Sequence, residues 1–371
     1  MRILSRYVLR EFLTPVFYCL VAFVSLHLVF ELFGEFDKII AAHPSPGIVA
    51  RYICGHIAKD LQWLVTPSLM LGGLYSMWQL ARHGEITAMR ANGIGFAAIT
   101  APIMKAAVVF ALVLLAVGEF YVPRAIHDAE AIKNSGFTSG PSKVLKDVHF
   151  NNVVGRRDWR AAVLNIPHHS LHNVSISWTD DNGYVVKTLS APRAFYQDGA
   201  WWFVDATMVD APEHPGAPEQ QGANNSYERT LLIMPELDEQ PRDFLIEQAL
   251  QGQGASAETL SSGDIRRYLA MRPNLEGADR RTWIYEMVNR FAAPLACIFI
   301  TLFAIPAGVA TGRQSVFMGV VSAIVLFIGY YALSLVCGVM AKGGTFPVWF
   351  GIVAPNAAIF AAGMWLFSRQ R

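Results

Sequence analysis

FLTPVFYCLVAFVSLHLVFELFG, the stretch at residues 12–34, decides the fold of this chain. It carries a single acidic side chain, Glu31, and no basic one. A membrane-spanning helix needs about 20 mostly apolar residues, and this run is long enough. It is longer than the apolar region of roughly 7–15 residues in a signal peptide, and no A-x-A cleavage site closes it. The stretch therefore predicts an uncleaved first membrane span.

Five further apolar runs have comparable length. They lie at residues 61–81, 99–122, 291–310, 315–341 and 346–367. The predicted fold is an α-helical membrane protein with six transmembrane helices, three before and three after an inserted antiparallel β domain. The predicted divisions are residues 1–122 for the first three spans, residues 123–283 for the insert with its linker, and residues 284–371 for the last three spans.

Composition and charge agree with this division. Apolar residues make up 53% of the chain, charged residues make up 16%, and the net charge is +1. Residues 123–283 carry a net charge of −5, whereas the remainder carries +6. A soluble domain has about 25% charged residues. The pattern excludes a uniform soluble globule and a disordered chain, and the lack of a strongly basic region argues against a nucleic-acid partner.

The lysines and arginines of the short loops predict the orientation, because cytoplasmic loops carry an excess of them. With the N-terminus inside, the inner side holds nine such residues and the outer side four. The inner residues are Arg2, Arg6, Arg10, Arg82, Arg90, Lys105, Arg313, Arg369 and Arg371; the outer ones are Lys38, Arg51, Lys59 and Lys342. Both termini are therefore expected in the cytoplasm, with the insert on the other side.

The insert has the pattern of β structure. Short, partly alternating segments occur at 160–166, 171–178, 184–189, 193–197, 200–209 and 227–234. Asp180-Asp181-Asn182-Gly183 and Gln197-Asp198-Gly199 are hairpin-type connections. Several short strands at this spacing favour an antiparallel sandwich or jelly roll. A polar loop is expected at 211–226, and a short helix near 263–271 with Asp264 in its first turn.

Motifs of catalysis do not occur. There is no G-x-x-x-x-G-K-[ST] phosphate loop, no H-E-x-x-H and no G-x-S-x-G. The four cysteines show no C-x-x-C spacing and are interpreted as packing residues. His168, His169 and His172 are interpreted as solvated histidines rather than metal ligands. We therefore predict a protein that is no enzyme and has no metal, no ATP site and no cofactor of its own.

The loop at 82–95, between the second and third spans, is the first candidate functional feature. Glu85–Ala91 can form a short helix with Ile86, Met89 and Arg90 on one face, and Asn92-Gly93 is a good helix stop. Held by two spans, such a helix could transmit a push from a soluble partner. Ionic contacts would come from Glu85 and Arg90, while Ile86 and Met89 would fill a groove of the partner. The alternative is an amphipathic loop resting on lipid headgroups.

A polar stripe at the end of the first span is the second candidate feature. His27, Glu31 and Glu35 recur at a spacing of four residues and share a helix face, and Lys38 follows. Ionisable groups within a span are costly and usually face a polar cavity or partner. The stripe predicts a path for an amphiphilic substrate. The alternative is charge at the outer headgroups, which suits Glu35 and Lys38.

Prolines and glycines also lie within the predicted spans. They predict kinks and close helix packing, and moving helices would use the same residues. They are Pro67, Pro294, Pro306, Pro355, Gly72, Gly73, Gly319 and Gly329.

Five stretches together resemble a known family. They are Arg6-Tyr7, GEITAMRANGI at 84–94, APRAFYQDGAWWF at 191–203, YEMVNRFAAPLACIFITLFAIPAG at 285–308 and WFGIVAPN at 349–356. Their order and content resemble the lipopolysaccharide-export permease family, the LptF/LptG pair. The similarity extends over nearly the whole chain, and the loop at 84–94 and the Arg-Phe-Ala entry into the fourth span are its most specific parts.

The resemblance implies one half of a twelve-span ABC-type transporter in the bacterial inner membrane. The other half would be a second six-span permease subunit, either a paralogue or a copy. A cytoplasmic ABC ATPase dimer, which binds the ATP, would attach to the loop between spans two and three. That role maps onto Glu85, Thr87, Ala88, Arg90, Ala91 and Gly93. Lipopolysaccharide would leave through gates lined by spans one and five, and a periplasmic β-jelly roll would pass it to bridge proteins.

Two other functions stay open on the residues alone. One is a structural or mechanotransmitting membrane protein that joins a cytoplasmic ATPase to an outer β domain and moves no lipid. The other is a membrane enzyme that modifies lipids, for which Glu31, Glu119 and Glu286 are the candidate acid or base groups. The sequence does not decide between the F-type and the G-type half.

Overall fold

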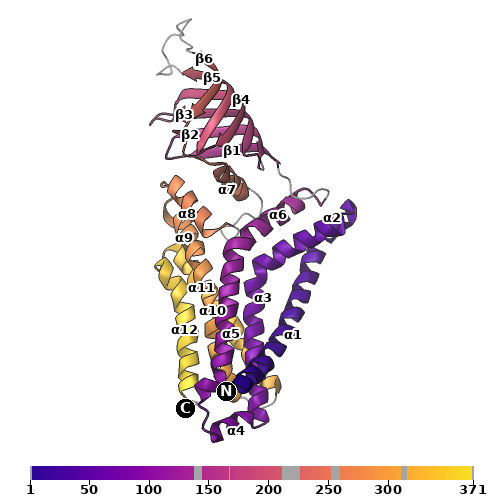
Figure 1. Ribbon diagram of the computed structural model, residues 1–371. Helices are drawn as coiled ribbons and strands as arrows, with labels where there is room; N and C mark the ends of the chain where they lie inside the picture. Colours follow the sequence, from indigo (N-terminus) through magenta and orange to yellow (C-terminus); the bar gives the residue numbers. More distant parts are fainter. Residues whose placement is uncertain are drawn as a thin grey trace. The chain divides into compact units, whose positions relative to one another are not determined.

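The computed structural model describes residues 2–137, 144–166, 168–210, 226–251, 260–310 and 316–369. The chain forms two compact units. One consists of Met1–Gly140 together with Gly277–Arg371, and the other is Pro141–Glu276. The first unit is helical and the second contains the sheet (Figure 1).

The first half of the helical unit contains two long helices and a third that continues through a π-helical turn. Its elements are α1 (Arg2–Gly34), α2 (Phe36–Ala42), α3 (Pro46–Arg82), α4 (Glu85–Ala91), α5 (Phe96–Ala116), the π turn η1 (Val117–Tyr121) and α6 (Val122–Asn134). Helix α1 begins well before the apolar run at 12–34, because the residues that precede the run also favour a helix. Helices α5, η1 and α6 follow one another without a gap, so the third predicted span ends inside a longer helical segment, Phe96–Lys133.

The second half of the helical unit ends at the C-terminus, which lies at the same end of this unit as the N-terminus (Figure 1). Its elements are α9 (Gly277–Ala292), α10 (Leu295–Ala310), α11 (Val316–Gly343) and α12 (Val348–Ser368). Between α9 and α10 the axis bends by 51°. Pro294 lies at this bend, where its missing N–H and its ring prevent a regular helix from continuing. The fourth predicted span, 291–310, therefore begins at a break.

Length and composition identify four described helical segments that could each cross a membrane. They are Ile3–Gly34, Phe96–Lys133, Ile324–Gly343 and Val348–Ser368, and the bent pair α9 and α10 would add a fifth. Helix α3, which contains the predicted second span, is long enough, but Thr66, Ser68 and two glycines dilute its apolar content. The apolar helices of a membrane protein are thus present, and the count of six spans stays a prediction.

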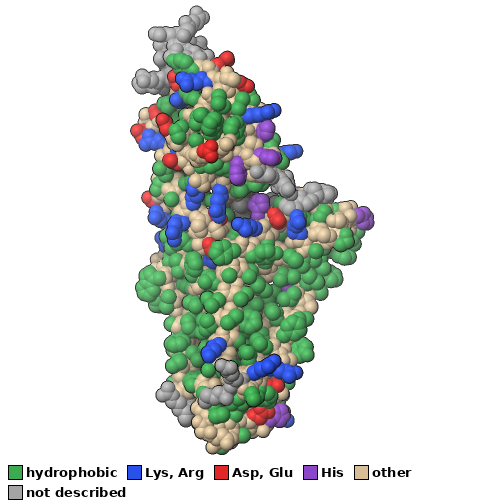
Figure 2. All heavy atoms as spheres, viewed as in Figure 1, with side chains coloured by type: hydrophobic (Ala, Val, Ile, Leu, Met, Phe, Trp, Pro, Cys, Tyr) green, Lys and Arg blue, Asp and Glu red, His purple; other side chains and the backbone are tan. Residues whose placement is uncertain are grey.

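The surface of the helical unit shows a broad hydrophobic band with charged side chains toward its ends (Figure 2). Large apolar side chains are exposed on two helices in particular. On α1 they include Phe17, Val21, Phe30 and Phe33, and on α11 they include Val325, Ile328, Leu335 and Val339. In water such a surface would mark an aggregation or interaction site, and on helices of this length it is typical of contact with lipid or another membrane helix.

Glycines let three helices of this unit approach closely. A Cβ at Gly72 would lie 2.3 Å from Cγ2 of Val16, and a Cβ at Gly308 would lie 2.5 Å from the carbonyl oxygen of Leu74. The predicted packing role is therefore correct for Gly72. At Gly329 a Cβ would meet no atom of the described chain within 4 Å, so close packing at that residue stays a prediction. Gly319 has no described side-chain environment.

The second unit is a six-stranded antiparallel sheet in which each strand pairs with its sequence neighbours, in the order β1-β2-β3-β4-β5-β6. The strands are β1 (Val144–Asn152), β2 (Arg157–Asn165), β3 (Ser170–Thr179), β4 (Val185–Gln197), β5 (Ala200–Asp210) and β6 (Ser226–Met234). The antiparallel β domain is confirmed, but the jelly roll is not what the described strands form. A jelly roll needs Greek-key crossovers, whereas every described pairing here joins strands that are consecutive in sequence.

One row of residues interrupts the sheet from edge to edge. Asp147, Asn173 and Asp205, on β1, β3 and β5, adopt left-handed backbone with φ of 50–52°. Each strand has a residue without a cross-strand partner at this level of the sheet, and these three residues occupy such positions. On β1, for example, Lys146 and Val148 have partners on β2 and the residue between them has none. Asp and Asn tolerate this conformation better than other side chains that carry a Cβ. We call this set of positions the bend row; its other members are Ala162, Pro192 and Thr230.

The bend row explains where strand prediction fails. Inward residues normally recur every second position, but across the row they are three apart, as in Ala161 and Leu164 or Ala191 and Ala194. The two predicted strands 184–189 and 193–197 are therefore one strand, β4, whose alternation is reset at Pro192. Strand β1 has no predicted counterpart, because Lys146, Asp147 and His149 hide its alternation.

The inner face of the sheet carries an aromatic core. Trp159, Trp201 and Phe203 are almost fully buried and pack with Phe244 from helix α7 (Pro241–Gln251). The predicted short helix is confirmed as α8 (Ser262–Met271), and Asp264 lies in its first turn. Ser261 and Asp264 form a capping box, which satisfies backbone donors at the helix start.

Candidate functional site

Helix α4 occupies the residues predicted for it, Glu85–Ala91. Gly84 precedes it with φ of 73°, and Gly93 follows it with φ of 81°. These left-handed positions favour glycine and allow the chain to turn sharply on both sides of one short helix. Helix α4 lies at the end of the helical unit that also holds both chain termini (Figure 1).

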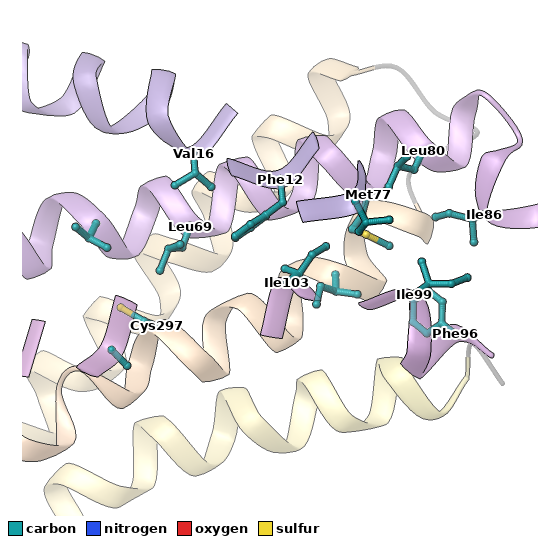
Figure 3. Packing of buried hydrophobic residues seen from close by; sticks show 14 of the residues in the cluster. Phe12, Val16, Leu69, Met77, Leu80, Ile86, Phe96, Ile99, Ile103 and Cys297 are labelled. Atoms are coloured by element: carbon teal, nitrogen blue, oxygen red, sulfur yellow. The ribbon is translucent and has the colours of Figure 1, made fainter. Parts of the chain in front are cut away.

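Ile86 and Met89 anchor α4 to its own chain. They are 5% and 8% exposed and belong to a cluster with Leu80, Phe96 and Val8. Figure 3 shows Ile86 beside Leu80 and Phe96, at the end of the core where α3 and α5 meet. The prediction that Ile86 and Met89 fill a groove of a partner is therefore wrong. An isolated seven-residue helix is not stable in water, and these two side chains supply the packing that holds it.

The opposite face of α4 is open. Thr87, Ala88, Arg90, Ala91 and Gly93 are all exposed. The predicted face of Ile86, Met89 and Arg90 is thus divided, because only the first two point inward. This leaves a small polar surface with one cation on a helix that the core holds in place.

Glu85 behaves differently from the rest of the predicted coupling set. It is half-buried, and its carboxylate accepts hydrogen bonds from the Tyr7 hydroxyl, at 2.9 Å to Oε2 and 3.1 Å to Oε1. Tyr7 belongs to α1, so this contact joins the first turns of the chain to α4. Sequence spacing gives no signal for a partner 78 positions away; only the quoted Arg6-Tyr7 pair marks that position.

The predicted polar stripe of α1 is matched by a second stripe on α3. Nε2 of His27 lies 3.5 Å from Oδ2 of Asp60, and Nδ1 of His56 lies 3.3 Å from Oε1 of Glu31. The Tyr52 hydroxyl donates to Oε1 of Glu31 at 2.5 Å. Residues 27 and 31 thus pair with residues 60, 56 and 52 as the helices run antiparallel. We call this set the polar zipper. Sequence reasoning finds its α1 half and misses Tyr52, His56 and Asp60.

The other two residues of the predicted stripe lie beyond the zipper: Glu35 directly precedes α2, and Lys38 is within it. Glu35 is 8% exposed, and its carboxylate contacts Nζ of Lys133 at 2.6 Å and Nζ of Lys38 at 2.7 Å. Burial raises the pKa of this carboxyl, but the hydrogen bonds and charges of the two lysines outweigh it, so the pKa lies below its usual value. Lys133, in α6, is a residue that sequence reasoning did not connect with this cluster.

The two candidate sets are not brought together. They are joined by α1, whose Tyr7 contacts α4 and whose His27 and Glu31 form the zipper. The rise of an α-helix places Tyr7 and His27 about 30 Å apart. The arrangement is therefore one continuous helix, with Pro15 inside it, that has a loop contact near its start and a charged cluster near its end.

The carboxylates of the enzyme hypothesis do not form one site. Glu31 contacts Tyr52 and His56, Glu119 lies 3.6 Å from Arg290, and Glu286 pairs with Lys342. Within the described residues no group of three His, Cys, Asp or Glu side chains could hold a metal ion. Each of these acids has a different cationic or hydrogen-bonding partner on a different helix, so none converges on a shared substrate position.

Comparison with known proteins gives a consistent result. A model of the family described as lipopolysaccharide export system permease LptF/LptG matches residues 6–369. The chain is 25% identical over 122 residues to the lipopolysaccharide export system permease protein LptG of Escherichia coli strain K12, and equally to that of strain CFT073 of serotype O6:H1. These matches cover 33% of this chain and 34% of each relative, so the chain aligns with about a third of their length.

Proposed function

The chain belongs to the LptF/LptG family of lipopolysaccharide export permeases, and from this we propose that it is the permease half of an ABC-type transporter. It extracts lipopolysaccharide from the inner membrane and passes it to periplasmic bridge proteins. A separate cytoplasmic ATPase dimer binds the ATP, and a second permease subunit, a paralogue or a copy, completes the channel. In this proposal both termini and α4 are cytoplasmic and the β unit is periplasmic.

The observation that carries the proposal is that one face of α4 is packed into the core and the other is exposed. Ile86 and Met89 fix the helix in the core shared with α1, α3 and α5, while Thr87, Ala88 and Arg90 remain exposed. A soluble partner that pressed on this exposed face would displace the packed core beneath it, because close-packed interiors transmit strain. This is what coupling between an ATPase and membrane helices requires.

The exposed apolar faces of α1 and α11 support the transport role. Both helices carry large side chains outward, such as Phe30 and Val325, while α3 and α10 are largely enclosed. In the proposed transporter these faces meet lipopolysaccharide acyl chains and the second subunit. The polar zipper would then place His27 and Glu31 beside that path, half-buried against α3.

The second candidate function is a mechanotransmitting protein that moves no lipid. The connection from α4 along α1 serves either function. Photo-crosslinking separates them: a probe at Leu32, beside Glu31, captures glycolipid if the chain exports it and captures none if the chain only transmits force.

The coupling surface is tested by charge reversal on the open face of α4. We expect Arg90→Glu to abolish co-purification of the ATPase in mild detergent while the chain itself remains folded, because Ile86 and Met89 are unchanged. Arg51→Glu, an exposed arginine at the other end of α3, is the matched control and should retain the ATPase. Retention of the ATPase by Arg90→Glu and also by a chain lacking residues 84–93 would contradict the proposal.

A further inference from the structure

Arg290, near the end of α9, contacts the π turn η1 in a way that the proposed function does not use. Its Nη1 donates a hydrogen bond to the carbonyl oxygen of Gly118 at 3.5 Å and lies 3.6 Å from Oε2 of Glu119. Both acceptors belong to η1. The Arg290 side chain is 9% exposed and that of Glu119 is 22% exposed. One largely buried guanidinium thus serves a backbone oxygen and a carboxylate of the same turn.

The π turn needs such a donor because of the proline that follows it. In its hydrogen-bonding pattern the Val122 amide donates to the carbonyl oxygen of Val117, five residues back. In the same pattern the next residue would donate to the carbonyl oxygen of Gly118. That residue is Pro123, which has no N–H. A backbone carbonyl without a donor is costly at the level of a membrane, and Arg290 supplies the donor from another helix.

The contact joins two helices that are each interrupted near a proline. Pro123 follows η1, and Pro294 lies at the 51° bend between α9 and α10. Helix α5 has 21 residues before the first break and α10 has 16 after the second, or about 31 and 24 Å at the rise of an α-helix. Both breaks therefore come close to where a hydrocarbon core of about 30 Å would end.

The same two helices connect the two compact units along the chain. After α6 the chain passes into the second unit, Pro141–Glu276, and it returns through α9. We call α6 and α9 the stem of the β unit. Arg290 contacts the turn from which α6 continues, so it joins the outgoing and the returning helix at their base.

We propose that Arg290 is a positioning residue for this stem: it gives Gly118 the hydrogen bond that Pro123 cannot give, and thereby pins α9 to the π turn at the start of α6. Glu119 compensates the charge that the arginine brings. The inference gives a role to the arginine of the Arg-Phe-Ala stretch. It holds for any function of the chain, because neither a lipid substrate nor an ATPase enters it.

Hydrogen–deuterium exchange of the full chain in lipid nanodiscs tests this contact. Arg290→Met removes the donor and keeps a long side chain. It should speed exchange of the amides at 117–122 by about tenfold or more, because hydrogen bonds of charged groups contribute that much. Arg280→Met, at an exposed arginine of the same helix, is the matched control and should leave this exchange unchanged.

Glu119 variants separate the hydrogen bond from the charge. Glu119→Gln leaves Arg290 on Gly118 and should change exchange less than Arg290→Met does. The double variant Glu119→Gln with Arg290→Met removes the unpaired carboxylate, and exchange should stay fast because Gly118 still has no donor. Exchange in α12 reports the overall fold. If Arg290→Met speeds exchange there too, Arg290→Lys carries the comparison, and it should lie between the unaltered chain and Arg290→Met.

The position of the stem is measured by the distance between two spin labels. Labels at Arg124 and Ala278, exposed on α6 and α9, are introduced after the four native cysteines are replaced. Their distance distribution should broaden in Arg290→Met. Labels at Ala98 and Ala310, exposed at the other ends of α5 and α10, should give the same distribution in both chains.

Three results would overturn the inference. The first is unchanged exchange at 117–122 in Arg290→Met. The second is a return to slow exchange in the double variant, which would assign the effect to the unpaired Glu119 alone. The third is an unchanged distance distribution between the two stem labels. Failure of the proposed function is a separate outcome, because none of these measurements involves lipopolysaccharide or an ATPase.

Discussion

At the residue scale, the buried carboxylate of Glu35 forms ion pairs with two lysines. It lies between α1 and α2 and joins Lys38 on α2 to Lys133 on α6. Two segments that are distant in sequence thus meet at one side chain. Removing one partner of a buried charge pair is destabilising because the remaining charge loses its compensation.

We predict that Glu35→Gln lowers the free energy of unfolding by about 1–3 kcal/mol at pH 7. The folded pKa of Glu35 lies below the usual 4.5. Its contribution is therefore present above the unfolded pKa and is lost as the pH falls through the folded pKa. The difference between the variant and the unaltered protein should shrink in thermal unfolding in detergent at pH 4 or below.

Asp37→Asn is the control for this prediction, because Asp37 is an exposed acid two residues further along, in α2. It should change stability little at either pH. An equal loss for Glu35→Gln at pH 7 and at the acidic pH would show that the effect is steric and would remove the role given to its charge.

Single residues also show what sequence could and could not predict about the site. The four-residue spacing correctly places His27 and Glu31 on the face of α1 that meets α3, because helical periodicity is local. Glu35 lies beyond the end of α1 and contacts Lys38 and Lys133 instead. The identity of the partners of His27 and Glu31 depends on how α1 and α3 align, which spacing within one helix does not encode. The same holds for Glu85, because its hydrogen-bond donor, Tyr7, lies on another helix and is not encoded by the local spacing.

At the scale of elements, the polar zipper is the main polar contact between α1 and α3. Within a membrane-facing helix pair such groups find few other partners, and buried hydrogen bonds there contribute about 0.6–2 kcal/mol each. The zipper fixes the relative height of the two helices, because a shift by one turn would pair His27 with His56 and leave Asp60 unmatched.

A double-mutant cycle tests this element contact. Tyr52→Phe and Glu31→Ala, alone and together, should show a coupling energy of about 1–2 kcal/mol in thermal unfolding, because each removes the same hydrogen bond. The same cycle with Tyr18→Phe in place of Tyr52→Phe should be additive within about 0.5 kcal/mol. Additivity of the Tyr52 and Glu31 changes would mean that the bond does not hold α1 on α3.

Elements were predicted well where one local signal dominates. Helix α4 matches its predicted limits because glycines bracket it, and α8 matches because of its capping residues. Strand β4 was divided in two because the bend row interrupts its alternation, and the break before α10 arises where Pro294 meets an otherwise continuous apolar run. These differences come from backbone geometry that hydropathy does not report.

At the scale of the whole molecule, the charge difference between the two parts of the sequence corresponds to two compact units. The acidic part, residues 123–283, contains the whole second unit, Pro141–Glu276, but it also includes most of α6, which belongs to the helical unit. Which strands pair with which was not predictable, because a meander and a jelly roll share the same strand lengths and turn residues. The observed pairing of each strand with its sequence neighbours identifies the meander.

We predict that residues 141–276, with the sheet and helices α7 and α8, fold without the helical unit. Their aromatic core, with Trp159, Trp201 and Phe244, is contained within that unit. The isolated segment should show a β-type circular dichroism spectrum and a cooperative thermal transition in tryptophan fluorescence. Phe244→Ala, expected to cost about 3–5 kcal/mol, should abolish or strongly lower that transition. A segment that shows no cooperative transition even when unaltered would contradict the prediction.

The bend row has a consequence for how this sheet tolerates insertions and deletions. In every strand the alternation of inward and outward side chains shifts by one residue at the bend row. Neighbouring strands therefore keep their register on both sides of the row. Deleting Asn173 alone would leave β3 out of phase with β2 and β4, and side chains such as Leu171 would turn outward on one side of the row. Length changes within these strands are therefore tolerated only in concert, whereas the hairpins between them are free to vary.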